Sequence, residues 1–140
     1  MSQITVPIPF DWTHIASGTP YAPAAFAFVQ EGLGYTSDLF TTRDKDAYEL
    51  GEFERHVTGQ QLCMGLRDFA IERFGMLAPV VLRHWGVQRT EDFGNLVFRM
   101  VDLELLRTSS RDSEEDFRAV FDFDEAFHMR DLVQTIGSNM

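Results

Sequence analysis

Cys63 is the side chain of this sequence best suited to nucleophilic chemistry, and His56 and His84 are candidate bases for it. A thiol becomes a nucleophile when a neighbouring imidazole takes its proton, so the fold would have to bring one histidine within hydrogen-bonding distance. Cys63 falls near the apolar stripe of a predicted helix, where a thiol is usually an inert part of the core. We therefore predict a core thiol and no catalytic residue.

The spacing of the potential metal ligands argues against a metal site. The four histidines are scattered, and none is placed one helical turn from another histidine or from the cysteine. The acidic residues of 112–116 lack the turn glycine and the ligand spacing of an EF-hand loop. We predict solvated carboxylates there, and neither a metal nor a cofactor.

The charge of the chain bears on its partners. The formal net charge is −10, and a strongly negative surface repels nucleic-acid phosphates and anionic lipid. No stretch approaches the roughly 18–20 apolar residues of a membrane span, and the first residues lack the basic and apolar regions of a signal peptide. We expect a cytoplasmic protein with a protein partner, without nucleic acid or membrane; the sequence does not indicate an oligomeric state.

The length and composition predict one domain with its own core. The chain has 140 residues, of which 44% are hydrophobic and 13 are phenylalanine. Proline and glycine interrupt any periodicity in residues 1–19, which predicts an irregular N-terminal arm. A single helical domain is predicted for residues 20–128, followed by a flexible tail at 129–140.

The first predicted helix begins between Pro20 and Pro23 and ends near Thr36, where polar residues follow. The second has the clearest local signals. Thr58 as the N-cap and Gln61 three residues later form a capping box, and Gly75 ends the helix.

Two further helices are predicted after Gly75. A short one covers 76–85, with Pro79 in its first turn and Gly86 closing it. The last begins with Thr90 as its N-cap and carries an apolar stripe from Phe93 to Val101. The fold class is therefore mainly α, with four helices around one core.

Residues 105–123 predict a small C-terminal β-hairpin, because Phe117, Ala119 and Phe121 alternate with polar positions. With a short strand at 54–57, the order of elements is winged-helix-like, and the last helix would then be the recognition helix. The candidate nucleic-acid-binding residues of this winged-helix arrangement are Arg89, Arg99, Arg107 and Arg111. The acidic residues interspersed among them argue against DNA binding.

Four stretches of the sequence form a joint pattern: His56-Val57-Thr58-Gly59-Gln60, Trp85-Gly86-Val87, Thr90-Glu91-Asp92-Phe93-Gly94, and Glu115-Asp116-Phe117 with Phe121-Asp122-Phe123-Asp124-Glu125-Ala126-Phe127. Together they resemble a bacterial family of short, single-domain proteins without an assigned role. The likeness covers about residues 20–128 and implies no catalytic residues.

The favoured functional hypothesis is a non-enzymatic protein-interaction or regulatory module. A winged-helix nucleic-acid-binding regulator is the alternative, and a small enzyme or metal protein is the third. Aromatic side chains in excess of what one core needs would anchor the partner. The candidate partner-binding residues are Trp12, Phe28, Trp85, Phe123 and Phe127.

Overall fold

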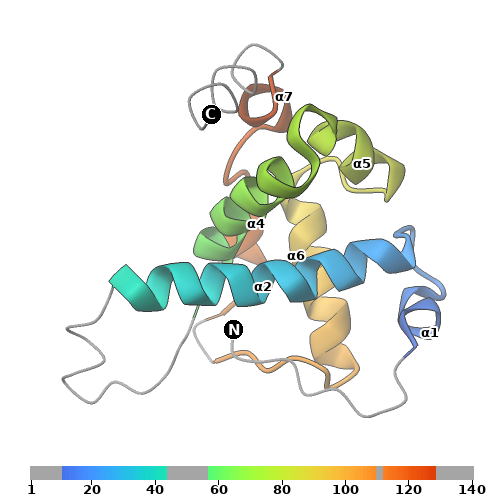
Figure 1. Cartoon of the computed structure of the whole chain (residues 1–140). Coiled ribbons are helices and arrows are strands. Elements are labelled where there is room, and N and C mark those ends of the chain that lie inside the picture. The colour runs from blue at the N-terminus through green and yellow to red at the C-terminus, as the bar shows by residue number, and fades with distance from the viewer. Residues whose placement is uncertain (1–10, 44–56, 110–111, 129–140) are drawn as a thin grey trace.

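The computed structural model of the chain describes residues 11–43, 57–109 and 112–128, with the backbone alone described for 40–43. In this part of the chain the fold is mainly helical, as predicted, and contains no strand. No helix among these residues combines the length and the apolar character that crossing a membrane requires. The elements of Figure 1 are α1 (Trp12–Ala16), α2 (Pro23–Arg43), α4 (Gly59–Phe74), the 3-10 helix η1 (Gly75–Leu77), α5 (Ala78–His84), α6 (Thr90–Asp102), the 3-10 helix η2 (Glu114–Phe117) and α7 (Phe123–Ala126).

Helix α2 is the longest element and packs against α1, α4 and α6 (Figure 1). It extends to Arg43, beyond the end predicted near Thr36. Thr36 does not end the helix because its side chain is buried and its hydroxyl donates to the carbonyl oxygen of Gly32, one turn earlier. A polar residue is compatible with a helix interior when its hydroxyl is satisfied in this way.

Helices α2 and α4 approach each other closely at two glycines. A Cβ atom on Gly65 would lie 1.9 Å from Oγ1 of Thr36, and one on Gly32 would lie 2.2 Å from Cδ2 of Leu66. Both distances are far below van der Waals contact. The crossing therefore depends on the absence of side chains at these two positions.

The local signals around α4 and α5 are confirmed. Thr58 and Gln61 form the capping box, with each side chain accepting from the other residue's backbone N–H. Gly75 ends α4 with a φ of 58°, and Gly86 follows α5 with a φ of 91°. Pro79 lies in the first turn of α5, where its missing N–H leaves no hydrogen bond unmade.

The predicted cap of α6 is wrong: Arg89 is the N-cap, and Thr90 is the first helical residue. Asp92 supplies the hydrogen-bond acceptor at the start of the helix. Its Oδ2 accepts from the backbone N–H groups of Gln88 and Arg89 at 2.9 and 3.2 Å. The buried Thr90 hydroxyl instead donates to the carbonyl oxygen of Phe117 at 2.7 Å.

The predicted β-hairpin is not confirmed, because the described residues of 105–123 contain the turn of η2 and no strand. Side chains of α6 occupy the backbone groups that a strand ladder would use. The Thr90 hydroxyl donates to the carbonyl oxygen of Phe117 and accepts from the backbone N–H of Val120. The Glu91 carboxylate accepts from the backbone N–H of Ala119. Partial burial alone would raise the pKa of Glu91, but the backbone N–H groups of Glu91 and Ala119 outweigh it and lower this pKa.

The predicted irregular arm contains a short helix. Asp11 caps α1 by accepting from the N–H of Thr13 at 2.9 Å, and Ile15 and Ala16 at the end of α1 are buried. Residues 1–10 of the arm, residues 54–56 of the predicted strand and the tail at 129–140 lie outside the described residues. Val57, the last residue of that predicted strand, is buried and not in a strand.

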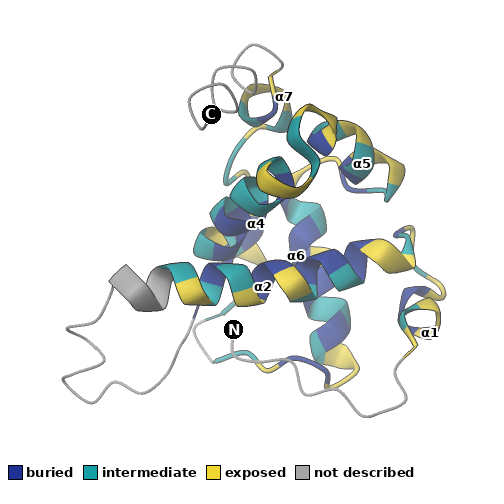
Figure 2. Cartoon of the chain, viewed as in Figure 1, coloured by how far each residue is buried: buried dark blue, intermediate teal, exposed yellow. Residues whose placement is uncertain are grey.

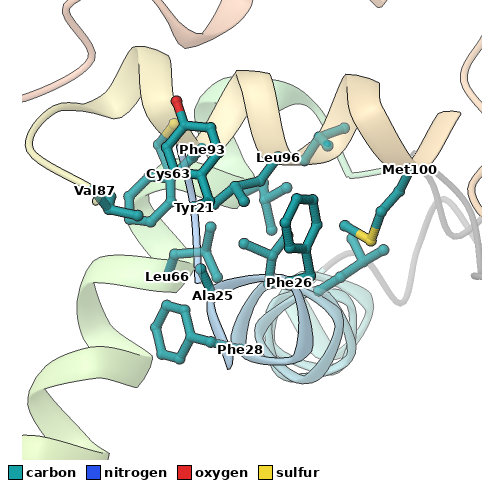
Figure 3. Packing of buried hydrophobic residues seen from close by; sticks show 14 of the residues in the cluster. Tyr21, Ala25, Phe26, Phe28, Cys63, Leu66, Val87, Phe93, Leu96 and Met100 are labelled. Atoms are coloured by element: carbon teal, nitrogen blue, oxygen red, sulfur yellow. The ribbon is translucent and has the colours of Figure 1, made fainter. Parts of the chain in front are cut away.

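The core lies where α2, α4 and α6 meet (Figure 2). Figure 3 shows Phe26 of α2 beside Leu96 and Met100 of α6, while Phe28 projects from another side of the same helix. Phe28 contacts a second set of rings, and it lies 5.3 Å from Phe69 between ring centroids. The interior thus continues on two sides of α2.

Candidate functional site

Cys63 is fully buried in α4, as predicted for a core thiol. Burial, and secondarily the charge of Glu91, raises the pKa of the thiol to about 12. The thiol is therefore protonated at neutral pH. His14, His84 and His128 have exposed side chains, and His56 lies outside the described residues.

The free energy of unfolding is expected to fall as the pH rises above about 9, and Cys63 should contribute to this loss. The thiol pKa is raised from 9.0 to about 12, so the folded state keeps a proton that the unfolded chain releases. This contribution is complete below pH 9.0 and is lost as the pH rises toward 12. Urea unfolding at a series of pH values should give a shallower decline for Cys63→Ala, and parallel curves would contradict the assignment.

Within the described ranges, no three histidine, cysteine or acidic side chains are grouped so that they could hold a metal ion. A different polar cluster joins the start of α2 to α6. The Tyr21 hydroxyl donates to Oδ1 of Asp92 at 2.6 Å and accepts from Nδ2 of Asn95 at 2.8 Å. Burial and the Asp92 contact raise the pKa of Tyr21 to about 12, so this hydroxyl is also protonated at neutral pH. The cluster therefore joins the segment before α2 to α6.

The five aromatic candidates for partner binding occupy two different environments. Phe28 and Phe127 are 3% and 5% exposed, so their side chains lie inside the fold. Trp12, Trp85 and Phe123 are half-buried. The structure brings Phe28 to Trp85 and Phe123 to Phe127, at 5.6 and 5.2 Å between ring centroids. Because Phe28 and Phe127 are buried, the five do not form one exposed surface.

The four candidate arginines are not gathered on one surface of α6. Arg99 donates from Nε to the carbonyl oxygen of Ile15 at 3.2 Å, which ties α6 to α1. Arg89 and Arg107 are exposed beyond opposite ends of α6, a 13-residue helix that is about 20 Å long. Arg111 lies outside the described residues.

An exposed apolar surface that the sequence did not reveal lies at the corner between α4 and α5. Met76, Leu77 and Val80 are 43%, 63% and 58% exposed, and Figure 2 shows exposed stretches on α5 and at its junction with α4. Val80 is three and four residues from the other two, so the three side chains share one side of the η1–α5 segment. We call these three residues the α5 face.

The opposite side of α5 fixes the orientation of the α5 face. Ala78 and Leu82 are fully buried, and the Trp85 ring at the end of α5 lies 5.6 Å from the ring centroids of both Phe28 and Phe74. The backbone N–H of Ala22 also donates to the carbonyl oxygen of Trp85 at 3.1 Å. The candidate anchor Trp85 therefore serves as a support beneath the face.

The segment that carries the α5 face differs in charge from the whole chain. Residues 73–90 contain three arginines and no acidic residue, in a chain with 22 acidic and 12 basic residues. Arg83 and His84 are exposed one helical turn beyond Val80, and we call these two residues the basic end. Neither forms an ion pair with a residue that the structure describes, whereas Arg73 is paired with Glu31.

Comparison with known proteins adds no assignment: no protein-family model, curated protein or solved structure matches the chain. The resemblance to a bacterial family stays a prediction. The candidate site is therefore argued from the structure of the chain alone. It consists of the exposed α5 face, the rings that pack beneath it and the basic end.

Proposed function

We propose that this protein is a non-enzymatic interaction module that binds a partner protein through the α5 face. The observation that carries the proposal is the exposure of three large apolar side chains side by side on one helical segment. Isolated exposed apolar residues are ordinary, but adjacent ones mark interaction surfaces. Such side chains bind when a partner removes them from water.

The packing beneath the α5 face supports this role. A binding surface that is already ordered loses little conformational entropy when a partner arrives. Pro79 restricts the backbone in the first turn of α5, and the rings of Phe28, Phe74 and Trp85 pack beneath the helix. These contacts hold α5 against the rest of the fold.

Site-specific crosslinking tests the proposal. A photoreactive amino acid at Leu77 should form an adduct with a protein partner in the native host, and adding Val80→Asp should abolish it. The same probe at Glu114, an exposed residue of η2, is the control and should give no such adduct. Val80→Asp should leave the free energy of unfolding within about 0.5 kcal/mol, because Val80 is an exposed surface residue.

The absence of a protein adduct at Leu77, or an equal yield from Leu77 and Glu114, would contradict the proposal. Persistence of the adduct in the Val80→Asp background would contradict it as well, since the change replaces an apolar side chain of the docking surface with a carboxylate that a partner would have to remove from water.

We propose further that the module acts in the cytoplasm, where its single cysteine, buried and without a disulfide, would remain a thiol. A winged-helix nucleic-acid regulator ranks second among the proposals. It would require a hairpin from residues 105–123 and basic side chains of α6 that face a groove. Arg99, the basic residue within α6, instead donates to the carbonyl oxygens of Ile15 in α1 and of Ser17, the residue after α1.

A further inference from the structure

The sign of the charge around the α5 face limits which partners can bind there. The chain carries a net charge of −10, yet residues 73–90 contain no acidic side chain. A local positive region on a negative protein attracts negative groups to that place and repels them elsewhere. The exposed Arg83 therefore favours an anionic group at this end of α5.

The basic end is placed to meet charges at the edge of an apolar contact. Arg83 and His84 follow Val80 by three and four residues on α5, so all three lie on neighbouring positions of one helix surface. Both are exposed and are not paired with any described acidic residue. Charges at the rim of an interface contribute mainly orientation and specificity, while the apolar centre supplies most of the affinity.

We propose that the occupant of the α5 face is a short acidic segment of a partner protein. This inference rests on the proposed function. The segment places large apolar side chains on Met76, Leu77 and Val80, and it directs a carboxylate to Arg83 and His84. The apolar contact and the charge contact lie one helical turn apart, which a single peptide strand or helix turn spans.

The net charge of the chain also favours an acidic segment over two other occupants, an anionic lipid surface and a second copy of the chain. An anionic lipid surface would meet three apolar side chains and the basic end, but it would repel the remainder of a chain with a net charge of −10. A second copy of the chain carries the same net charge, so two copies repel each other at low salt. A short acidic segment of a partner brings few charges close to the rest of the protein.

A displayed library of random linear peptides, selected on the purified full chain, tests the inference. The selected peptides should be enriched in aspartate and glutamate beside leucine, phenylalanine or tryptophan. Arg83→Glu should weaken binding of a selected peptide about tenfold, because one attraction is lost and one repulsion is created at the rim. Arg107→Glu makes the same charge change beyond the far end of α6, and it should alter binding less than about twofold.

The outcomes separate this inference from the proposed function. Selected peptides without acidic enrichment, or equal effects of Arg83→Glu and Arg107→Glu, would overturn the acidic partner while leaving the α5 face as a docking site if Val80→Asp still abolishes binding. Binding that survives Val80→Asp would overturn both. Binding only to phosphatidylglycerol vesicles, or concentration-dependent self-association that Val80→Asp removes, would replace the acidic partner by a lipid surface or a second copy.

Discussion

Replacing Phe117 with alanine is expected to lower the free energy of unfolding by about 3–5 kcal/mol, as for other fully buried phenylalanines. Phe117 is 1% exposed, and its ring lies against two glycines from different helices. A Cβ atom on Gly59 of α4 would lie 2.9 Å from Cε2 of the ring, and one on Gly94 of α6 would lie 2.9 Å from Cγ. Alanine would leave a cavity between two helices that have no side chains there to fill it.

Urea unfolding followed by circular dichroism measures this loss, and Phe121→Ala is the matched control. Phe121 lies four residues along the chain, is half-buried and stacks on Phe123 at 5.5 Å between ring centroids. Its replacement should cost about 1 kcal/mol, since less of its apolar area leaves water on folding. Equal losses for the two variants would contradict the role of Phe117 as the side chain that joins η2 to α4 and α6.

Gly65→Ala is expected to destabilise the fold by about 1–3 kcal/mol, although alanine favours helices. The three nearest atoms to a Cβ at this position all belong to Thr36, and the shortest distance is 1.9 Å, to Oγ1. Thr36 is fully buried and hydrogen-bonded to Gly32, so its side chain has little room to move. The added methyl group would therefore push α2 away from α4.

Two further variants isolate the clash at Gly65. Gly34→Ala introduces the same side chain on α2 at an exposed position with no atom within 4 Å, so it should stabilise the fold by about 1 kcal/mol. Thr36→Ala combined with Gly65→Ala should recover about 1–2 kcal/mol relative to the sum of the single changes. Strict additivity of the two changes, measured by chemical denaturation, would show that they do not meet.

Local chemistry explains which elements were predictable from the sequence. The capping box of Thr58 and Gln61, the ending at Gly75 and the first-turn Pro79 each involve residues within a few positions of one another. Their conformations depend on backbone geometry that the neighbouring residues set. Interactions between residues that are this close in the sequence can therefore be predicted from the order of the residue types.

Long-range contacts explain where the predictions failed. Thr90 was expected to cap its own helix, but its hydroxyl bonds the carbonyl of Phe117, 27 residues away. Phe117 was expected to alternate within a strand, but its ring fits between Gly59 and Gly94. Neither partner is visible from the sequence neighbours of these residues, because tertiary packing overrides local propensity.

The candidate site was hidden for a different reason. The apolar run around Leu77 and Val80 has the composition of a buried segment, and the helical prediction for 76–85 was close to the structure. Which side of a short helix faces inward depends on the helices that cover it, here α4 with Phe74 and α2 with Phe28. The sequence shows that residues 73–90 contain arginines and no acidic residue. This charge pattern indicates a binding site only when it is known that the neighbouring apolar side chains are exposed.

The close approach of α2 and α4 also constrains how this protein can diverge. Every single-base change of a glycine codon that alters the amino acid adds a side chain, and at Gly65 each such side chain would enter the space of Thr36. A substitution at position 65 is therefore less destabilising after a smaller residue has appeared at position 36. The geometry of one helix crossing thus favours one order of the two substitutions.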